Sequence, residues 1–326
     1  MNKLVLGIDG GGTKTLAAIC DSSGQVLGVG RGGASNIDDV GLEQASQNIQ
    51  QAVAAARENA HLEPRPFDTA FLGLAGIVSA RDRALVHGLG AKLELAAPER
   101  LGVDHDCKIA LAGGLSGRAG IVLIAGTGSS CYGVNAAGDS WRAGGWGSLI
   151  SDEGSAYFLG RESLIASVRA LDGRGPNTEL AAIMLEHLGV QQADDLLHRI
   201  YVSGLSRSDI AALAPVVLEV ATGGDAVALE ILERGCALLA ECVKAVAKRL
   251  QLEHDAFEVV AVGGLYTASE LLRQKLRQQI LEFLPGAHIT QPELSPVLGA
   301  CLLALEMRNA LTPASLAKLK LERNRT

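Results

Sequence analysis

Short apolar runs alternate with longer amphipathic segments in the first third of the chain. Runs at residues 4–8, 16–20 and 26–30 predict three strands, and the polar and glycine residues at 21–24 predict a tight turn between the last two. Apolar positions at helical spacing predict the first helix over residues 42–60. The pattern then predicts a strand at 70–74, a helix at 80–95, a short strand that ends near Val103 and a helix from about Cys107 to Gly113 and Gly114.

The same series of signals begins again near residue 121. Residues 121–125 form a buried run like residues 4–8, and a glycine–threonine turn follows each run, at 126–129 and 12–15. At one constant offset, three residues of the first copy fall on identical residues of the second: Gly12, Thr13 and Gly24 on Gly126, Thr127 and Gly138. The repeat predicts a duplicated unit of strand, Gly/Thr turn, strand, Gly turn and strand.

The rest of the chain is predicted to be mainly helical. Residues 152–252 carry helical patterns, with one long amphipathic helix at 225–250. A final strand is expected at 257–262, and helices are expected at 269–283 and 296–309, with a basic surface helix at 313–325. Strands and helices in this order predict an α/β protein.

Composition narrows the class of protein. The chain has 326 residues, of which 48% are apolar, which suits about two domains. A net charge of −7 argues against a nucleic-acid partner, because such binding is dominated by phosphate contacts. The six cysteines contain no CxxC pair and no zinc-like spacing, so we expect reduced thiols. The sequence carries no evident signal peptide or membrane-spanning run, and we expect a cytoplasmic protein without a membrane partner.

The sharpest chemical feature is the segment 9–15, Asp-Gly-Gly-Gly-Thr-Lys-Thr, directly after the first buried run. Its three glycines let backbone N–H groups approach an anion closely, and Thr13 and Thr15 add hydroxyl donors. Asp9 at the strand end would hold Mg²⁺ through water. The Gly-Thr-Lys order and the strand that follows distinguish this turn from a Walker A loop. A plain structural hairpin is the alternative.

The second turn, at residues 126–129, strengthens the interpretation of the first. Two hairpin turns from duplicated halves, facing each other across a cleft, would grip the phosphates of one nucleotide together. Neither turn would suffice alone. The alternative is that both turns are purely structural.

The segment Asp104-His105-Asp106 lies at a strand end before a predicted helix. A carboxylate at such a position would take a proton from a sugar hydroxyl. Alternatively, Asp104 or Asp106 only caps the helix. His105 is expected to pack or to form a hydrogen bond.

Residues 144–156 form a fourth candidate segment. Their glycines, Trp146 and Asp152 are a combination typical of sugar sites. The alternative is a loop in which Asp152 and Glu153 stand at a helix N-terminus, where the helix dipole favours negative charge.

In this order, the segments resemble the N-acetylglucosamine kinase family of the sugar kinase, Hsp70 and actin superfamily. The resemblance lies in the branch shared with the ATPase activators of benzoyl-CoA reductase, and it extends from Leu4 to about Ala304. It rests on the segments 7–15, 35–36, 72–76, Asp106 with Ala110 and Leu111, 124–129, 144–147, 152–157, 262–264 and 295–300.

The resemblance implies an α/β fold of two duplicated RNase H-like domains, as in actin-like ATPases, around a central cleft. Residues 1–117 would form the N-terminal domain, and residues 118–300 would form the C-terminal domain with a helical insertion. Helices in residues 301–326 would pack back toward the N-terminal domain. A homodimer is also implied.

The resemblance assigns roles to individual residues. Asp106 would be the general base and Asp9 the Mg²⁺ ligand, while His105 stands where the family usually has Thr or Asn, and Asp104 is a competing carboxylate. ATP would be bound by Gly10, Gly11, Gly12, Thr13, Lys14, Gly126, Thr127, Gly128, Ser129, Gly263 and Gly264. The sugar would contact Asn36, Asp106, Gly145, Trp146 and Asp152.

The implied activity is ATP-dependent phosphorylation of an amino sugar at its 6-hydroxyl, for amino-sugar salvage. N-acetylglucosamine is the first candidate and glucosamine the second, and N-acetylmuramic acid stays open. An ATP-hydrolysing activator of a partner enzyme is the rival from another class, but it needs cysteines placed for an iron–sulfur cluster, and none pair convincingly. A sugar-sensing regulator without catalysis is a further rival.

Overall fold

The computed structural model describes residues 3–323 and divides into two compact units. Within these residues, the first unit comprises 3–122, 132–138 and 290–323, and the second comprises 123–131 and 139–289. The described chain contains two five-stranded sheets.

The first sheet has the strand order β3-β2-β1-β4-β5. Strand β1 pairs antiparallel with β2 and parallel with β4, β2 pairs antiparallel with β3, and β4 pairs parallel with β5. The five strands span Leu4–Gly10, Thr15–Asp21, Val26–Gly32, Thr69–Leu74 and Leu101–His105, and all five were expected from the sequence. The register aligns Asp9 of β1 with Gly73 of β4, and Gly73 with Asp104 of β5, so three strands end at one edge.

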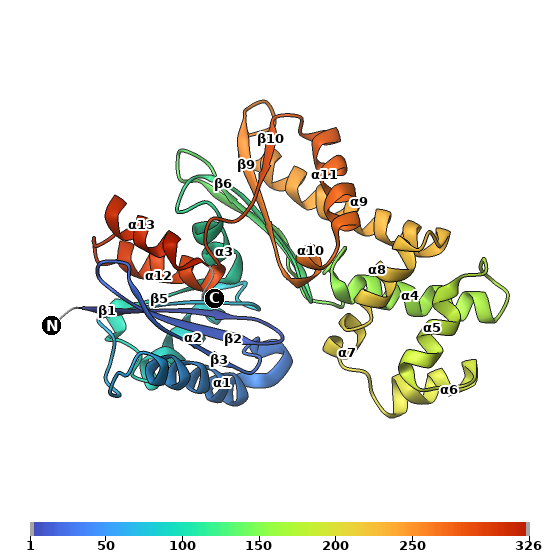
Figure 1. Ribbon diagram of the computed structural model, residues 1–326, viewed down its shortest axis with the longest axis horizontal. Helices are drawn as coiled ribbons and strands as arrows, with labels where there is room; N and C mark the ends of the chain where they lie inside the picture. The colour runs from blue at the N-terminus through green and yellow to red at the C-terminus, as the bar shows by residue number, and fades with distance from the viewer. Residues whose placement is uncertain (1–2, 324–326) are drawn as a thin grey trace. The chain divides into compact units, whose positions relative to one another are not determined.

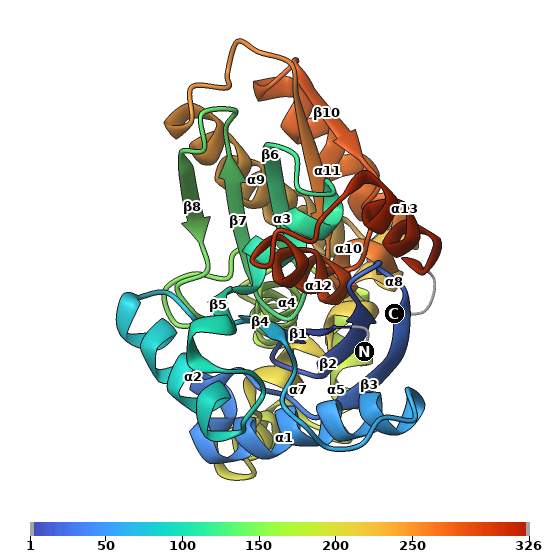
Figure 2. The same ribbon diagram turned by 90° about the vertical axis from the view of Figure 1, so that its left-hand side faces the viewer.

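Helices cover both faces of this sheet (Figures 1 and 2). Successive residues of β1 point to opposite faces, so Leu6 and Ile8 pack in one core and Val5 packs in another. The first core includes residues of α1 (Ile37–Asn59) and α2 (Ala80–Lys92). The second includes residues of α3 (Asp106–Gly114), α12 (Pro296–Glu306) and α13 (Pro313–Leu321). A short 3₁₀ turn, η1 (Pro98–Arg100), precedes β5.

The second sheet has the order β10-β9-β6-β7-β8, so its five strands take the same places as β5, β4, β1, β2 and β3 in the first sheet. The expected duplication of the strand–turn–strand–turn–strand unit is therefore confirmed. The strands span Gly120–Ala125, Ser129–Val134, Ser140–Gly144, Phe257–Val262 and Ala287–Thr290.

Strand β10 corrects one prediction, because residues 257–262 are not the final strand. The segment Ala287–Thr290 has four residues, of which only Ala287 is buried. So short an edge strand has almost no alternating apolar signal, and its pairing with β9 defines it instead.

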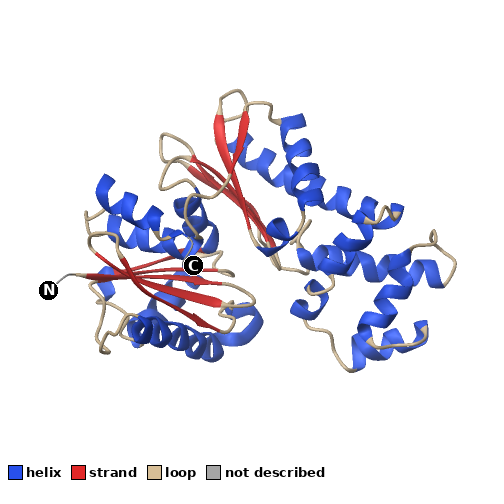
Figure 3. Ribbon diagram, in the orientation of Figure 1, coloured by secondary structure: helices blue, strands red, loops and turns tan. Residues whose placement is uncertain are grey.

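Helices account for most of residues 152–252, as expected from the sequence (Figure 3). Helix α9 contacts β8 and α11, and α4 contacts α5, α7, α8 and α9. The helices of this region and the next are α4 (Ala156–Leu171), α5 (Glu179–Leu188), α6 (Ala193–Leu197), the π-helix η2 (His198–Val202), α7 (Arg207–Ala211), α8 (Ala214–Thr222), α9 (Ala226–Arg249), α10 (Gly264–Ala268) and α11 (Glu270–Phe283).

Helix α1 begins at Ile37, five residues earlier than the apolar pattern predicts. Asn36 caps the first turn by accepting a hydrogen bond from the backbone N–H of Asp38. Gly41, at φ 77°, interrupts the helical geometry after that turn. The periodic pattern therefore starts only after the interruption.

No single helix within residues 3–323 is long and apolar enough to cross a bilayer. The segments Arg207–Thr222 and Ala226–Arg249 meet that test only as a pair, bent by 118°. The apolar face of α9, which includes Leu239 and Val243, is buried in the second unit.

Close backbone packing of α12 on α3 yields the first prediction. A Cβ on Gly299 would lie 2.0 Å from the carbonyl oxygen of Ile109 and 2.5 Å from the backbone nitrogen of Gly113. We expect Gly299→Ala to destabilise the protein by about 2–3 kcal/mol, because neither backbone atom can yield without moving a helix. Urea unfolding measures this change. The matched control is Gly88→Ala in α2, where a Cβ meets open space, and it should be neutral or stabilise by up to about 1 kcal/mol.

Candidate functional site

The turn after β1 is held by backbone donors from two neighbouring segments of the first unit. Within the turn, the N–H of Gly11 donates to the carbonyl of Lys14 at 3.0 Å, as expected for a hairpin. The carbonyl of Gly11 accepts hydrogen bonds from the N–H groups of Ser35 and Asn36 at 3.0 and 3.2 Å. The carbonyl of Gly10 accepts one from Ala75 at 2.8 Å.

Glycine is required at position 10, because a Cβ there would lie 2.2 Å from the Oγ of Ser35. Thr13 and Lys14 are exposed at the tip of the turn, where a ligand can reach them. Thr15 is fully buried, and its hydroxyl donates to the carbonyl of Gly33 at 2.6 Å. The expectation that Thr15 supplies a hydroxyl to an anion is therefore wrong, since that hydroxyl bonds to the segment that follows β3 instead.

Asp9 stands at the carboxyl end of β1, beside the turn. Burial and, to a smaller extent, the negative charge of Asp106 together raise the pKa of Asp9 to about 7, although the positive charge of Lys14 opposes them. A cation would stabilise the charged form of this buried carboxylate. The environment of Asp9 therefore suits a divalent metal ion.

A second set of possible ligand atoms includes Asp106, whose charge acts on Asp9. His105, Asp106 and Cys107 offer ligand atoms that all lie within 4.8 Å of one another. This set combines nitrogen, oxygen and sulfur, whereas Mg²⁺ prefers oxygen alone. The set therefore does not replace Asp9 as the predicted Mg²⁺ ligand.

His105, and neither aspartate, caps α3. Its Nδ1 accepts a hydrogen bond from the N–H of Lys108 at 3.2 Å, and its ring packs edge-on against Tyr132 at 4.6 Å between centroids. The alternative in which Asp104 or Asp106 caps the helix is wrong, and the expectation that His105 packs and forms a hydrogen bond is confirmed.

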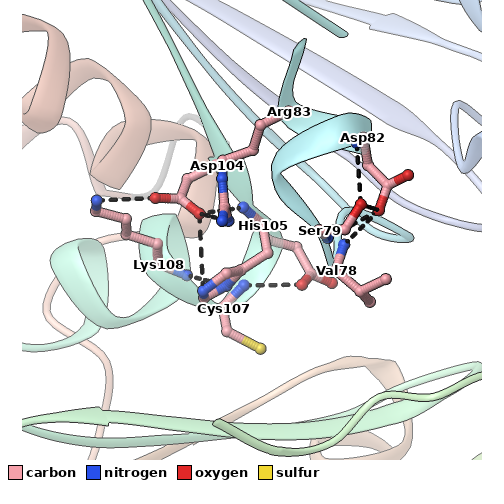
Figure 4. Close-up of polar contacts among 9 residues, drawn as sticks. Val78, Ser79, Asp82, Arg83, Asp104, His105, Cys107 and Lys108 are labelled. Atoms are coloured by element: carbon pink, nitrogen blue, oxygen red, sulfur yellow. Dashed lines mark hydrogen bonds and ion pairs between the residues drawn. The ribbon is translucent and has the colours of Figure 1, made fainter. Parts of the chain in front are cut away.

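Asp104 is committed to ion pairs. Figure 4 shows Lys108 and Arg83 directed at its carboxylate, with N–O distances of 2.9 and 3.4 Å. Burial alone would raise the pKa of Asp104, but the hydrogen bond and charge of Lys108, with the charge of His105, outweigh burial and lower it. Asp106 instead begins α3, where its Oδ1 accepts the N–H of Cys107 at 2.8 Å.

Asn36 is buried beside the first turn. Its Oδ1 caps α1, and its Nδ2 donates to the Oδ2 of Asp39 at 2.8 Å. The Oδ1 lies 2.5 Å from where a Cβ on Gly76 would stand, and Gly76 has φ 86°. The loops after β1, β3 and β4 thus meet around this amide.

The turn after β6, residues 126–129, is held differently from the first turn. The N–H of Gly126 donates to the carbonyl of Gly128 at 3.0 Å. The first N–H groups of α4, from Ala156 and Tyr157, donate to the carbonyls of Gly126 and Thr127 at 2.9 and 3.2 Å. This turn is therefore fixed to a helix N-terminus of its own unit.

Asp152 lies against the second turn rather than in a helix. Its Oδ1 accepts the N–H of Ser129 at 3.2 Å, and its Oδ2 pairs with the Nη2 of Arg207 at 2.7 Å. The cap of α4 is Ser155, which accepts the N–H of Phe158. Asp152 and Glu153 thus stand in the loop just before this cap, outside the helix itself.

The predicted sugar loop follows β8. Gly144 and Gly145 both have φ 71°, and Trp146 is 62% exposed with the guanidinium of Arg142 over its ring at 5.2 Å. A Cβ on Gly145 would lie 2.7 Å from the Oγ of Ser130. Within residues 3–323, this buried Oγ has no hydrogen-bond partner, which makes Ser130 a polar group aimed at the loop.

Sequence reasoning missed Ser130, although one signal was available. At the offset that places Gly12 on Gly126, Ser130 falls on the apolar Leu16. A hydroxyl in a buried strand, at a position that is apolar in the first copy of the repeat, is the signal that could have drawn attention to Ser130.

Gly263 brings a third glycine segment to the second turn. It has φ 114°, and a Cβ there would lie 2.3 Å from the carbonyl oxygen of Ala125 and 3.0 Å from the nitrogen of Gly126. Gly264 begins α10, where a Cβ would meet open space. The second unit thus brings together the second turn, Asp152, Ser130 and Gly263.

Comparisons with known proteins identify relatives along almost the whole chain. The BadF/BadG/BcrA/BcrD ATPase family matches residues 6–304. An N-acetylmuramic acid/N-acetylglucosamine kinase of Clostridium acetobutylicum is 32% identical, over 93% of this chain and 98% of its own. An N-acetyl-D-glucosamine kinase of Dictyostelium discoideum is 32% identical, over 94% and 99%. The structure of a Chromobacterium violaceum protein, provisionally named an N-acetylglucosamine kinase, is 28% identical, with a TM-score of 0.77 over 93% of this chain and 99% of its own.

The environment of Asp9 yields a prediction on stability. Its pKa of about 7 in the folded protein exceeds the ordinary 3.8, so the cost to folding is absent below pH 3.8 and complete above about pH 7. We expect Asp9→Asn, without metal, to raise the free energy of unfolding at pH 8 by roughly 2–4 kcal/mol and to change it little at pH 4. Thermal and urea unfolding in EDTA measure both values.

Asp21 supplies a control of opposite sign. Burial alone would raise its pKa, but hydrogen bonds from Ser23 and Gln25 outweigh burial and lower it. Asp21→Asn should therefore destabilise the protein at pH 8. If Asp9→Asn destabilised the protein at both pH values, the account of Asp9 as a strained carboxylate would be wrong.

Proposed function

Because the chain belongs to the BadF/BadG/BcrA/BcrD ATPase family, we propose that it is an ATP-dependent kinase that phosphorylates the 6-hydroxyl of an amino sugar. N-acetylglucosamine is the preferred candidate, in agreement with the activities named for the relatives from Clostridium acetobutylicum and Dictyostelium discoideum. The observation that carries the proposal is the buried carboxylate of Asp9 at the end of β1, beside a glycine turn and close enough to Asp106 for that charge to raise its pKa.

The nucleotide is bound through its phosphates by both glycine turns. In the first turn, the exposed Thr13 and Lys14 reach the phosphates together with the backbone of Gly10, Gly11 and Gly12. In the second turn, the backbone of Gly126, Thr127, Gly128 and Ser129 does the same. The adenosine lies against Gly263 and Gly264. Because Gly263 has no side chain, its backbone can approach the second turn closely.

Asp9 is the group that would hold Mg²⁺, and its environment fits that role because a cation offsets both its burial and the charge of Asp106. When bound, Mg²⁺ neutralises the charge of the transferred phosphoryl group.

Asp106 orients the sugar 6-hydroxyl and accepts its proton as the phosphoryl group is transferred. The neighbouring Asp104 is a poorer candidate because Lys108 and Arg83 hold it as an ion pair. Asn36, Gly145, Trp146 and Asp152 bind the sugar, with the exposed indole of Trp146 available to an apolar face of the ring. Phosphoryl transfer needs mainly such positioning and charge stabilisation.

The rival function as an activator ATPase receives no support from the thiols. Of the six cysteines, five are buried and Cys242 is partly buried, so none offers the exposed thiolate that a shared iron–sulfur cluster requires. Glucosamine and N-acetylmuramic acid stay alternative substrates, and a cytoplasmic homodimer that serves amino-sugar salvage stays a prediction.

A coupled ADP-release assay with MgATP and a panel of hexoses and amino sugars tests the proposal. We expect strong turnover with one amino sugar, N-acetylglucosamine first, and little with glucose. ADP release that is independent of any sugar would instead indicate an activator ATPase.

Asp106→Asn tests the base. We expect kcat to fall by about 10²–10⁴-fold while ATP still binds, because the proton acceptor is lost and the nucleotide contacts are not. Asp104→Asn is the matched control and should keep kcat within about tenfold, since Asp104 only stabilises its ion pairs. A fully active Asp106→Asn enzyme would refute the assignment.

A further inference from the structure

The ion pair between Arg207 and Asp152 joins two segments of the second unit that are 55 residues apart in sequence. The Asp152 side chain is 4% exposed and that of Arg207 is 21% exposed, so the pair is largely removed from water. Asp152 also has φ 62°, a left-handed conformation that is uncommon for a residue other than glycine. Strained backbone together with a buried charge is a combination that clusters at functional sites.

The pair lies directly on the second glycine turn. A Cβ on Gly128 would lie 2.5 Å from the Nη2 of Arg207 and 2.7 Å from the Oδ1 of Asp152. The same Oδ1 accepts the N–H of Ser129 at 3.2 Å. Asp152 therefore connects the turn on one side to the guanidinium on the other.

Packed helices, rather than the turn, determine where Arg207 stands. Arg207 is the first residue of α7, whose start is fixed by a capping box between Ser206 and Asp209. Helix α7 packs on α4 so closely that a Cβ on Gly160 would lie 1.9 Å from the carbonyl oxygen of Ile210. Since α4 also donates its first N–H groups to the turn, α4, α7 and the turn form one connected assembly.

We infer that Arg207 is a positioning residue of the phosphotransfer site: it holds the carboxylate of Asp152 against Gly128 and Ser129, and so fixes a sugar ligand relative to the second phosphate turn. This inference rests on the proposed function, in which Asp152 binds the sugar and the turn binds phosphate. Arg207 acts through Asp152. Without its cation, a largely buried carboxylate stands uncompensated beside a turn that must receive an anionic phosphate.

Steady-state kinetics of Arg207→Met, Arg207→Lys and the control Arg174→Met test the inference. We expect Arg207→Met to lower kcat/KM for the sugar by about 10- to 100-fold, mainly through a higher KM for the sugar, because a small displacement of a substrate ligand has effects of this size. Arg207→Lys should recover part of the loss, since an ammonium can pair with Asp152 but lacks the planar fork of a guanidinium. Arg174 pairs only with the exposed Asp172 in what the structure describes, and its variant should match the wild type.

A purely structural role for Arg207 would give a different result. Loss of folded enzyme lowers the apparent kcat and leaves both KM values unchanged, and lysine would then rescue stability without any effect on KM. That outcome, or an Arg207→Met enzyme with wild-type kinetics, would overturn the inference.

The double variant Asp152→Asn/Arg207→Met keeps the test valid if Arg207→Met alone does not fold. The double variant removes the uncompensated charge, and its kcat/KM should equal that of Asp152→Asn within about threefold, because the two residues act as one unit. Independent, additive losses would contradict the inference. If the wild-type enzyme phosphorylates no sugar in the panel, the proposed function fails instead, and that failure is visible before any variant is made.

Discussion

Several backbone carbonyls of the two glycine turns accept hydrogen bonds from donors outside the turns, and these contacts organise both units. A glycine-rich turn without side chains can approach an anion, but its carbonyls need partners, because a buried polar group without one is costly. In the first unit, the segment Ser35-Asn36 and Ala75 supply the donors. In the second unit, the first turn of α4 supplies them through Ala156 and Tyr157. The two copies of the repeated unit thus satisfy the carbonyls of their turns with donors from different kinds of segment, loops in the first and a helix in the second.

This difference between the turns explains where the remaining chemistry lies. The donors of the first turn come from the loops after β3 and β4, so Asn36 and Ala75 lie against the turn that follows Asp9. The donors of the second turn come from a helix, so the helical region packs against this turn and brings Arg207 to Asp152. The duplicated sheets position the two turns, and the segments that donate hydrogen bonds to each turn bring side chains such as Asn36 and Arg207 close to it.

The charges of four carboxylates are balanced in different ways. Asp104 and Asp152 are neutralised by basic partners, which fixes their positions. Asp9 is instead buried near Asp106, and its pKa rises to about 7. A buried carboxylate near a second carboxylate destabilises the folded protein, and groups with such shifted pKa values are common at functional sites. The competition between Asp104 and Asp106 for the role of base was open from the sequence, and the ion pairs of Asp104 now favour Asp106.

The sequence by itself determined the repeated sheets and the two turns, because strand alternation and glycine clusters are local signals. It also indicated the candidates Asp9, Asp106 and Asp152. Only the tertiary structure decided that His105 caps α3, that the Thr15 hydroxyl donates to the carbonyl of Gly33, and that β10 completes the second sheet. It alone brought Arg207 to Asp152, since contacts between residues far apart in sequence depend on how helices pack and leave no mark at either position.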